Sequence, residues 1–150
     1  MKFNIKFTLA CCGVLAPLAV VVLHAAVVRA TAPAGRYTIA SGAVTDNQTK
    51  LVWQQALSAL YTQPVAMAYC PTLAGGTWRA PSMKELQTLV DDTQLSPAID
   101  TTAFPNATAE AFWTSTLLAG SSSLAYNVDF TDGKTNAVSR SISSRVRCVR

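Results

Sequence analysis

The sequence has almost no histidine and few charged residues. His24 is the only histidine of the 150 residues, 13% of the residues are charged and 50% are hydrophobic. This composition excludes a disordered charged tail, and the absence of a Gly-X-Y repeat excludes a collagen-like chain. His24 lies in an apolar N-terminal segment. If that segment is removed, a Ser-His-Asp triad, a Cys-His pair and a histidine zinc site are excluded within the remaining chain.

The N-terminal segment has the pattern of a secretory leader. Lys2 and Lys6 precede an uncharged run over residues 7–28, and Ala30 offers a small side chain where a signal peptidase cuts. We therefore predict a signal peptide over residues 1–30 and an exported protein of the periplasm, cell surface or extracellular space. An uncleaved anchor is the alternative, because the 22 uncharged residues are long enough to span a bilayer.

Two of the four cysteines remain after the leader is removed. Cys11 and Cys12 leave with it, whereas Cys70 and Cys148 stay. Two cysteines in an exported domain most simply pair. Closing a loop of about 79 residues would stabilise the fold by roughly 4 to 5 kcal/mol in the loop-entropy description. A free reactive thiol is the alternative, but no histidine is present to activate it.

Positive charge is concentrated at the C-terminal end. Residues 31–133 carry four basic and eight acidic side chains, whereas residues 134–150 carry five basic and no acidic ones. The five are Lys134, Arg140, Arg145, Arg147 and Arg150. Guanidinium groups bind sulfate and carboxylate through two parallel hydrogen bonds, so we predict that the first four bind sulfated glycans or other polyanions. The alternative is a solvated strand face, or ion pairs with the acidic remainder.

The first half of the remaining chain predicts short strands and two helices. Strands are expected at residues 37–39, 43–45 and 51–53, with turn-forming residues between them. Pro64 fits the first turn of a helix that Gly75-Gly76 ends. The run Ser82-Met83-Lys84-Glu85 fits a capping box, so a second helix starts there and ends near Asp91. Its expected apolar stripe consists of Met83, Leu86, Leu89 and Val90.

The second half predicts a long loop and an antiparallel sheet. Residues 92–110 have few periodic apolar positions, and strands follow at 112–116, 124–130 and 135–139. Alternation places Tyr126 on the buried face. A last strand over 145–148 would direct Val146 and Cys148 inward and Arg145 and Arg147 outward, with the disulfide linking it to the first helix. We expect Trp53, Trp78 and Trp113 in the core rather than stacked on sugars.

The order of these motifs resembles a known bacterial exported family, that of the C-terminal domain of the Legionella collagen-like adhesin. The motifs are Gly42-Ala43-Val44-Thr45-Asp46-Asn47, Leu51-Val52-Trp53-Gln54, Tyr69-Cys70, Trp78-Arg79-Ala80-Pro81-Ser82-Met83-Lys84-Glu85-Leu86, Pro97-Ala98-Ile99-Asp100, Phe104-Pro105, Trp113-Thr114-Ser115, Val128-Asp129-Phe130 and Val146-Arg147-Cys148-Val149-Arg150. A more distant likeness is to the formylglycine-generating, sulfatase-modifying enzymes. Their reactive cysteine pair has no counterpart here, because both remaining cysteines occupy structural positions.

The resemblance implies an α+β, C-type-lectin-like fold over residues 36–150, with residues 31–35 as a linker. In such a fold two helices pack on a small twisted antiparallel sheet, and a disulfide joins the first helix to the last strand. The adhesin that names the family is associated with sulfated glycosaminoglycans. The calcium-binding tripeptides of sugar-binding C-type lectins are absent from this sequence. Calcium-dependent sugar binding is therefore not expected from Asp91, Asp92, Asp100, Asp129 or Asp132.

We thus predict an exported, non-catalytic binding module with no cofactor, no metal and no nucleic-acid partner. Its ligand would be a glycan or a surface polyanion, offered by residues 92–124 and the C-terminal basic residues. One alternative is a structural or assembly module of the cell surface that binds a protein partner. The last is an accessory domain of an enzyme or a carboxylate-based hydrolase. Contact with a membrane is expected only if the N-terminal segment is retained.

Overall fold

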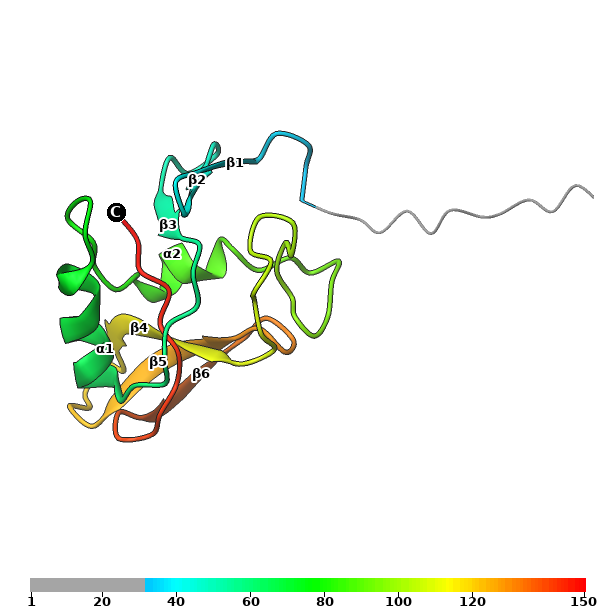
Figure 1. The fold of residues 1–150 in the computed structure, drawn as a ribbon. Helices are drawn as coiled ribbons and strands as arrows, with labels where there is room; N and C mark the ends of the chain where they lie inside the picture. The colour runs from blue at the N-terminus through cyan, green and yellow to red at the C-terminus, as the bar shows by residue number, and fades with distance from the viewer. Residues whose placement is uncertain (1–31) are drawn as a thin grey trace, which may run out of the picture.

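The computed structural model describes residues 32–150. The predicted signal peptide over residues 1–30, and its alternative as an anchor, therefore lie outside the described residues. The elements, in chain order, are β1 (Tyr37–Ala40), β2 (Ala43–Asp46), β3 (Val52–Gln54), α1 (Gln63–Tyr69), the 3-10 turn η1 (Cys70–Thr72), α2 (Met83–Gln87), β4 (Ala111–Leu117), β5 (Leu124–Asp129) and β6 (Lys134–Ser139). Figure 1 shows how they are arranged. The predicted α+β class is confirmed, with two small antiparallel sheets in place of one.

The first sheet has the strand order β1-β2-β3. Tight turns that the sequence predicts connect its strands. Ser41 and Gly42 have positive φ angles of 50° and 75° between β1 and β2, which is the conformation of a two-residue hairpin. Asp46 then accepts the backbone N–H of Gln48 at 2.9 Å, and this bond turns the chain toward β3. These local hydrogen bonds explain why the first strands could be predicted.

The second sheet has the order β4-β5-β6, and β5 is its central strand. Ala125 packs in the cluster around the disulfide, whereas Val128 packs in the other core cluster. Because β5 is covered on both faces, a simple alternation of buried and exposed residues does not apply. Asn127 is buried and Tyr126 is only half-buried, so the prediction of a core Tyr126 is wrong.

The two helices are shorter than the sequence pattern predicts. The capping box of α2 is present: Glu85 N donates to Ser82 Oγ at 3.3 Å, and Ser82 N donates to Glu85 Oε2 at 2.8 Å. The helix ends at Gln87 rather than near Asp91. Beyond it, Leu89 N and Val90 N donate to carbonyls three residues back, which tightens the last turn. Leu86 and Leu89 are nevertheless buried, as expected.

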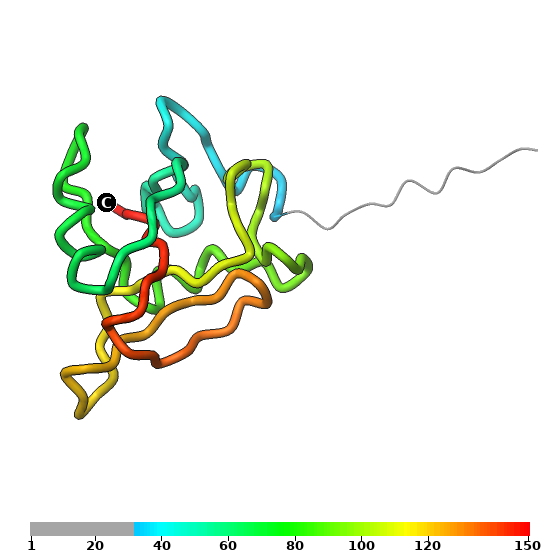
Figure 2. Tube along the Cα trace, turned by 60° about the horizontal axis from the view of Figure 1, so that its bottom comes forward, coloured from blue at the N-terminus to red at the C-terminus, as the bar shows by residue number. Residues whose placement is uncertain are grey.

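The C-terminal segment, residues 144–150, connects the two sheets (Figure 2). Beside β4, Arg145 O accepts the backbone N–H of Trp113 at 2.8 Å. Further on, Cys148 O accepts the N–H of Gln54 at 2.9 Å, and Val149 pairs with both Trp53 and Arg79. The segment is therefore a series of single bridges rather than the regular strand that was predicted.

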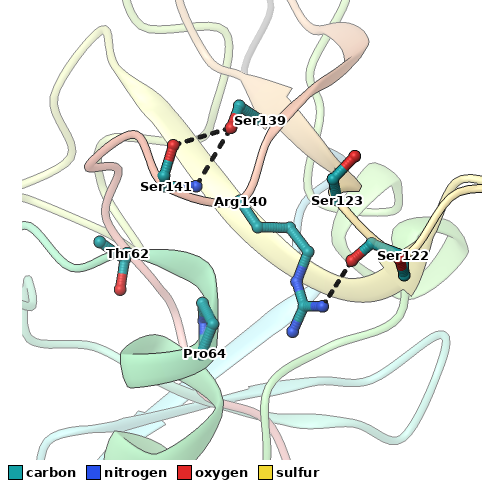
Figure 3. A pocket seen from close by; sticks show the side chains of 7 residues that line it. All are labelled: Thr62, Pro64, Ser122, Ser123, Ser139, Arg140 and Ser141. Carbon is teal, nitrogen blue, oxygen red and sulfur yellow. Dashed lines mark hydrogen bonds between the residues drawn. The ribbon is translucent and has the colours of Figure 1, made fainter.

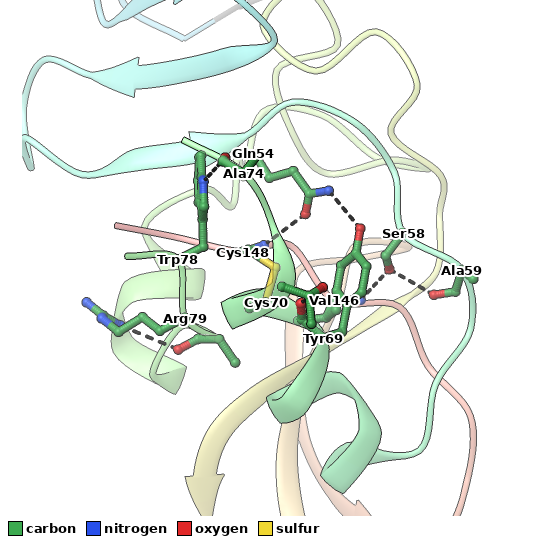
Figure 4. Close-up of a disulfide and its surroundings, with 12 residues drawn as sticks. Gln54, Ser58, Ala59, Tyr69, Cys70, Ala74, Trp78, Arg79, Val146 and Cys148 are labelled. Carbon is green, nitrogen blue, oxygen red and sulfur yellow. Dashed lines mark hydrogen bonds between the residues drawn. A yellow bond between two sulfur atoms is a disulfide. The ribbon is translucent and has the colours of Figure 1, made fainter. Parts of the chain in front are cut away.

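The disulfide Cys70–Cys148 fixes this segment to the end of α1, and it is confirmed (Figure 4). Both cysteines are fully buried, with their Cα atoms 5.5 Å apart. The three tryptophans lie in the core as predicted: Trp53 and Trp113 are 0% exposed and Trp78 is 8% exposed. The disulfide and the bridges of the C-terminal segment together fix the backbone that carries Arg145, Arg147 and Arg150.

Candidate functional site

The structure separates the predicted basic residues instead of gathering them. Of the nine basic side chains in residues 32–150, four form ion pairs with carboxylates. The pairs are Arg36–Asp46, Arg79–Glu85, Lys134–Asp132 and Arg145–Glu110. Lys134 begins β6 and Arg140 follows its last residue, so the two lie about 20 Å apart along an extended strand. No continuous basic strip results.

Arg147 was predicted to face solvent, and this prediction is wrong. Its side chain is 1% exposed, and the guanidinium carbon lies 4.4 Å from the ring centre of Phe104 and 5.5 Å from that of Phe112. Its Nη1 donates to the carbonyls of Gln54 and Gln55 at 2.8 and 3.0 Å. Burial lowers the pKa of Arg147 to about 10, so it stays charged at neutral pH. A buried guanidinium cannot reach an external polymer.

Arg145 is half-buried and already paired. Its Nε donates to Glu110, its Nη1 donates to the carbonyl of Ser58, and its hydrogen bond lowers the pKa of Glu110. Lys134 is far more exposed, but it pairs with Asp132 in the β5–β6 turn. An external anion would have to compete with a carboxylate at each of these two side chains.

Arg140 is the predicted residue that lies in a pocket without an acidic partner. Among the described residues, no carboxylate pairs with it or lines the pocket, which has a volume of about 560 Å³. The start of α1, the β4–β5 loop and the end of β6 form the walls (Figure 3). We call it the Arg140 pocket. Its lining residues are Thr62, Pro64, Ser122, Ser123, Ser139, Arg140 and Ser141.

Four hydrogen bonds fix Arg140 in this pocket. Its Nε donates to Gln63 Oε1 at 2.9 Å, and its Nη1 donates to the carbonyl of Ser122 at 2.8 Å. Its backbone N–H donates to the carbonyl of Ser123, and its own carbonyl accepts the N–H of Gln63, both at 3.0 Å. Gln63 is 2% exposed and donates to the carbonyl of Thr114 on β4 at 3.2 Å. The guanidinium is thus held in place before any ligand arrives.

Sequence reasoning missed Gln63 and the hydroxyl lining. Gln63 lies 77 residues from Arg140, and no local pattern marks the pair. The serine lining could have been recognised in the sequence, because residues 121–123 and 139–144 are both rich in serine and flank a predicted hairpin. Ser139 Oγ and Ser141 Oγ lie 2.8 Å apart. Hydroxyl groups can both donate and accept, so such walls suit a polar ligand.

The acidic residues serve local structure. Burial alone would raise the pKa of Asp46, but hydrogen bonds from Gln48 and Arg36 outweigh it and lower that pKa. Asp100 and Asp129 accept backbone N–H groups of their own loops. Residues 32–150 hold no group of three or more His, Cys, Asp or Glu side chains that could bind a metal ion.

The same residues include no helix long and apolar enough to cross a membrane.

The long loop over residues 92–110 contributes a few side chains to the core, and many of its other residues are exposed. Ile99, Ala103 and Phe104 are buried, whereas Leu95 is 74% exposed. Only the later part of the predicted ligand region, at Ser122 and Ser123, lines the Arg140 pocket.

The family model of the Lcl C-terminal domain matches residues 42–150. The chain belongs to the Lcl C-terminal domain family. This confirms the resemblance to the Legionella collagen-like adhesin family. Every residue that lines the Arg140 pocket falls within the matched Lcl C-terminal domain. Membership of this family suggests a surface-associated, adhesin-like module. No curated protein matches the chain.

Proposed function

We propose that this Lcl C-terminal domain is an exported, non-catalytic binding module that recognises anionic glycans, without calcium, at the Arg140 pocket. One observation carries the proposal: Arg140 is fixed by Gln63 and the serine loop, and no acidic partner among residues 32–150 neutralises it. The fold is proposed to be C-type-lectin-like, in agreement with the two helices, the antiparallel sheets and the disulfide.

The chemistry of the pocket supports a sulfated or carboxylated sugar. A guanidinium binds such oxyanions through two parallel N–H bonds and is weakly hydrated, so little is lost when it leaves water. The hydroxyls of Ser122, Ser123, Ser139 and Ser141 lie along the walls of the same pocket (Figure 3). They can exchange hydrogen bonds with sugar hydroxyls. Lys134 and Arg145 would add only weak attraction, because each already has a carboxylate partner.

Exposed apolar side chains favour a protein partner as the second candidate. Leu60 and Val65 flank the residues at the start of α1 and are 53% and 49% exposed. Ile142, which follows the serine at the pocket edge, is 43% exposed. A structural or assembly contact at the cell surface would bury these side chains.

Binding of the purified protein to heparin and to fully desulfated heparin tests the proposal. We expect binding to heparin that weakens with added salt and is the same in calcium and in chelator. Arg140→Gln should reduce the affinity about tenfold, because a charge-assisted hydrogen bond contributes roughly 1.5 to 3 kcal/mol. Lys84→Gln is the matched control, since it removes one exposed charge from α2. Equal loss in both variants, or a requirement for calcium, would overturn the proposal.

A further inference from the structure

A second pocket lies at the other end of the segment formed by α1 and η1. The Arg140 pocket involves Thr62 and Pro64 at the start of α1, whereas this pocket involves Leu73 and Gly75 just beyond η1. Its volume is about 340 Å³, and Trp78 and Arg150 form part of its wall. The end of the C-terminal segment lies near the loop that follows η1 (Figure 1), and Arg150 lines the pocket.

Arg150 is fixed at its backbone and its side chain. Its N–H donates to the carbonyl of Val52, and its carbonyl accepts the N–H of Val52, both at 2.9 Å. Its guanidinium carbon lies 4.6 Å from the ring centre of Trp78. The indole is itself fixed, because Trp78 Nε1 donates to the carbonyl of Ala74 at 3.1 Å (Figure 4). A rigid aromatic face thus supports one side of the cation.

The backbone of Gly75 and Gly76 passes along the edge of this guanidinium. Gly76 has a φ of 143°, a conformation that side chains rarely adopt. A Cβ atom at Gly76 would collide with Arg150 Nη1. The φ angle therefore favours glycine at this position, and the loop lies against a second side of the guanidinium.

No aspartate or glutamate side chain pairs with Arg150 in the part of the chain that the structure describes. Arg150 is absent from all four ion pairs, and its side chain donates no hydrogen bond to residues 32–150. Residues 51–78, which supply Trp78 and the glycine loop, contain no charged residue. The exposed guanidinium keeps N–H donors that can bind an external acceptor.

We propose that Arg150, supported by Trp78 and the Gly75-Gly76 loop, is a second anion-binding subsite that takes a sulfate or carboxylate group. An oxyanion with two acceptor oxygens can bind in the guanidinium plane at the N–H groups that the glycine loop does not cover, since the indole occupies only one face. This inference rests on the proposed function for its natural ligand, an anionic glycan. Two fixed cations at opposite ends of one segment would engage separate anionic groups of one chain.

A titration with small anions tests the subsite without any glycan. The indole N–H signals of Trp53, Trp78 and Trp113 are followed by NMR as sulfate or acetate replaces chloride at constant ionic strength. We expect a saturable shift of the Trp78 signal in the wild type and in Arg140→Gln, and its loss in Arg150→Gln. A Trp78 signal that does not move, or that still moves in Arg150→Gln, would overturn the subsite. If Arg150→Gln does not fold, Arg150→Lys replaces it, because lysine keeps the charge but lacks the planar guanidinium. We expect Arg150→Lys to bind sulfate at least fivefold more weakly than the wild type. An unchanged sulfate affinity would contradict the proposal.

Heparin binding then separates the two proposals. Arg150→Gln should weaken heparin binding three- to tenfold, and its effect should add to that of Arg140→Gln. Carboxyl-reduced heparin and desulfated heparin identify which oxyanion Arg150 binds. Removal of that oxyanion from heparin should lower the affinity of the wild type, but it should not lower the affinity of Arg150→Gln. A saturable Trp78 shift without heparin binding would refute the glycan proposal and leave the anion subsite standing. Heparin binding that Arg150→Gln leaves unchanged would refute a contribution of the subsite to glycan binding and leave the Arg140 pocket standing.

Discussion

Gln63 Oε1 accepts a hydrogen bond from Arg140 Nε at 2.9 Å, across 77 residues of sequence. The same amide donates through Nε2 to the carbonyl of Thr114 on β4, so one buried glutamine connects the start of α1, the second sheet and the half-buried Arg140. Gln63 therefore helps to position Arg140, although it does not line the pocket itself.

Gln63→Glu should weaken heparin binding while the protein stays folded. A carboxylate beside Arg140 would compete with the anionic ligand, and we expect a loss of affinity of about tenfold. Affinity is measured by titration calorimetry. Gln87→Glu on α2 is the matched control, because it makes the same charge change at an exposed position that contacts Thr135. Equal affinities of the two variants would show that Gln63 does not position Arg140.

Cys70→Ser should lower the melting temperature and make Cys148 reactive toward thiol reagents. Both sulfurs are fully buried, and the bond attaches the C-terminal segment to the end of α1. Loss of such a disulfide typically costs about 2 to 5 kcal/mol of unfolding free energy. Calorimetry and thiol labelling provide the two measurements. A melting temperature equal to that of the wild type would contradict a stabilising role for the bond.

Arg147→Ala should destabilise the fold strongly. The change removes two hydrogen bonds to buried carbonyls and the contacts with Phe104 and Phe112. We expect a loss of roughly 2 to 4 kcal/mol, measured by denaturant unfolding. Lys50→Ala, at an exposed turn, serves as the control and should change stability by less than about 0.5 kcal/mol. Comparable stability of the two variants would mean that Arg147 is not part of the core.

Glu85 should give the protein a pH-dependent stability in acid. Its hydrogen bond with Arg79 and those with Ser82 lower the pKa of Glu85 from 4.5 to about 2. A carboxylate whose pKa is lower in the folded state stabilises fully above the unfolded pKa. That stabilisation is lost as the pH falls from about 4.5 through about 2.

Glu85→Gln tests this pH dependence, since the amide keeps the shape of the side chain but cannot titrate. Melting temperatures of both proteins are compared at pH 7 and at pH 3. The difference in melting temperature between the wild type and the variant should be larger at pH 7 than at pH 3. An equal difference at the two pH values would assign the acid sensitivity to other carboxylates.

Local chemistry made much of the fold predictable. Ser82 and Glu85 lie three residues apart and form the capping box wherever the helix packs, and the turn at Ser41-Gly42 follows from the freedom of those residues to adopt positive φ. The pairing of Cys70 with Cys148 was also predictable, because only two cysteines lie beyond residue 30.

The tertiary structure decided whether each basic residue is buried, paired with a carboxylate or open to solvent. The alternation in residues 145–148 predicts that Arg145 and Arg147 share an exposed face, but the segment runs between two sheets and is covered on both sides. Phe104 and the carbonyls of Gln54 and Gln55 then surround Arg147.

The sequence by itself therefore determined the element types, the disulfide and the excess of positive charge near the chain end. Which cations face an open pocket depended on partners 35 to 93 residues away: Glu110 neutralises Arg145, Gln54 buries Arg147 and Gln63 fixes Arg140. Local periodicity describes one element and its neighbours along the chain. Charge compensation and burial arise from contacts between elements, so only the assembled fold distinguishes the arginines that remain free to bind from those that hold the structure together.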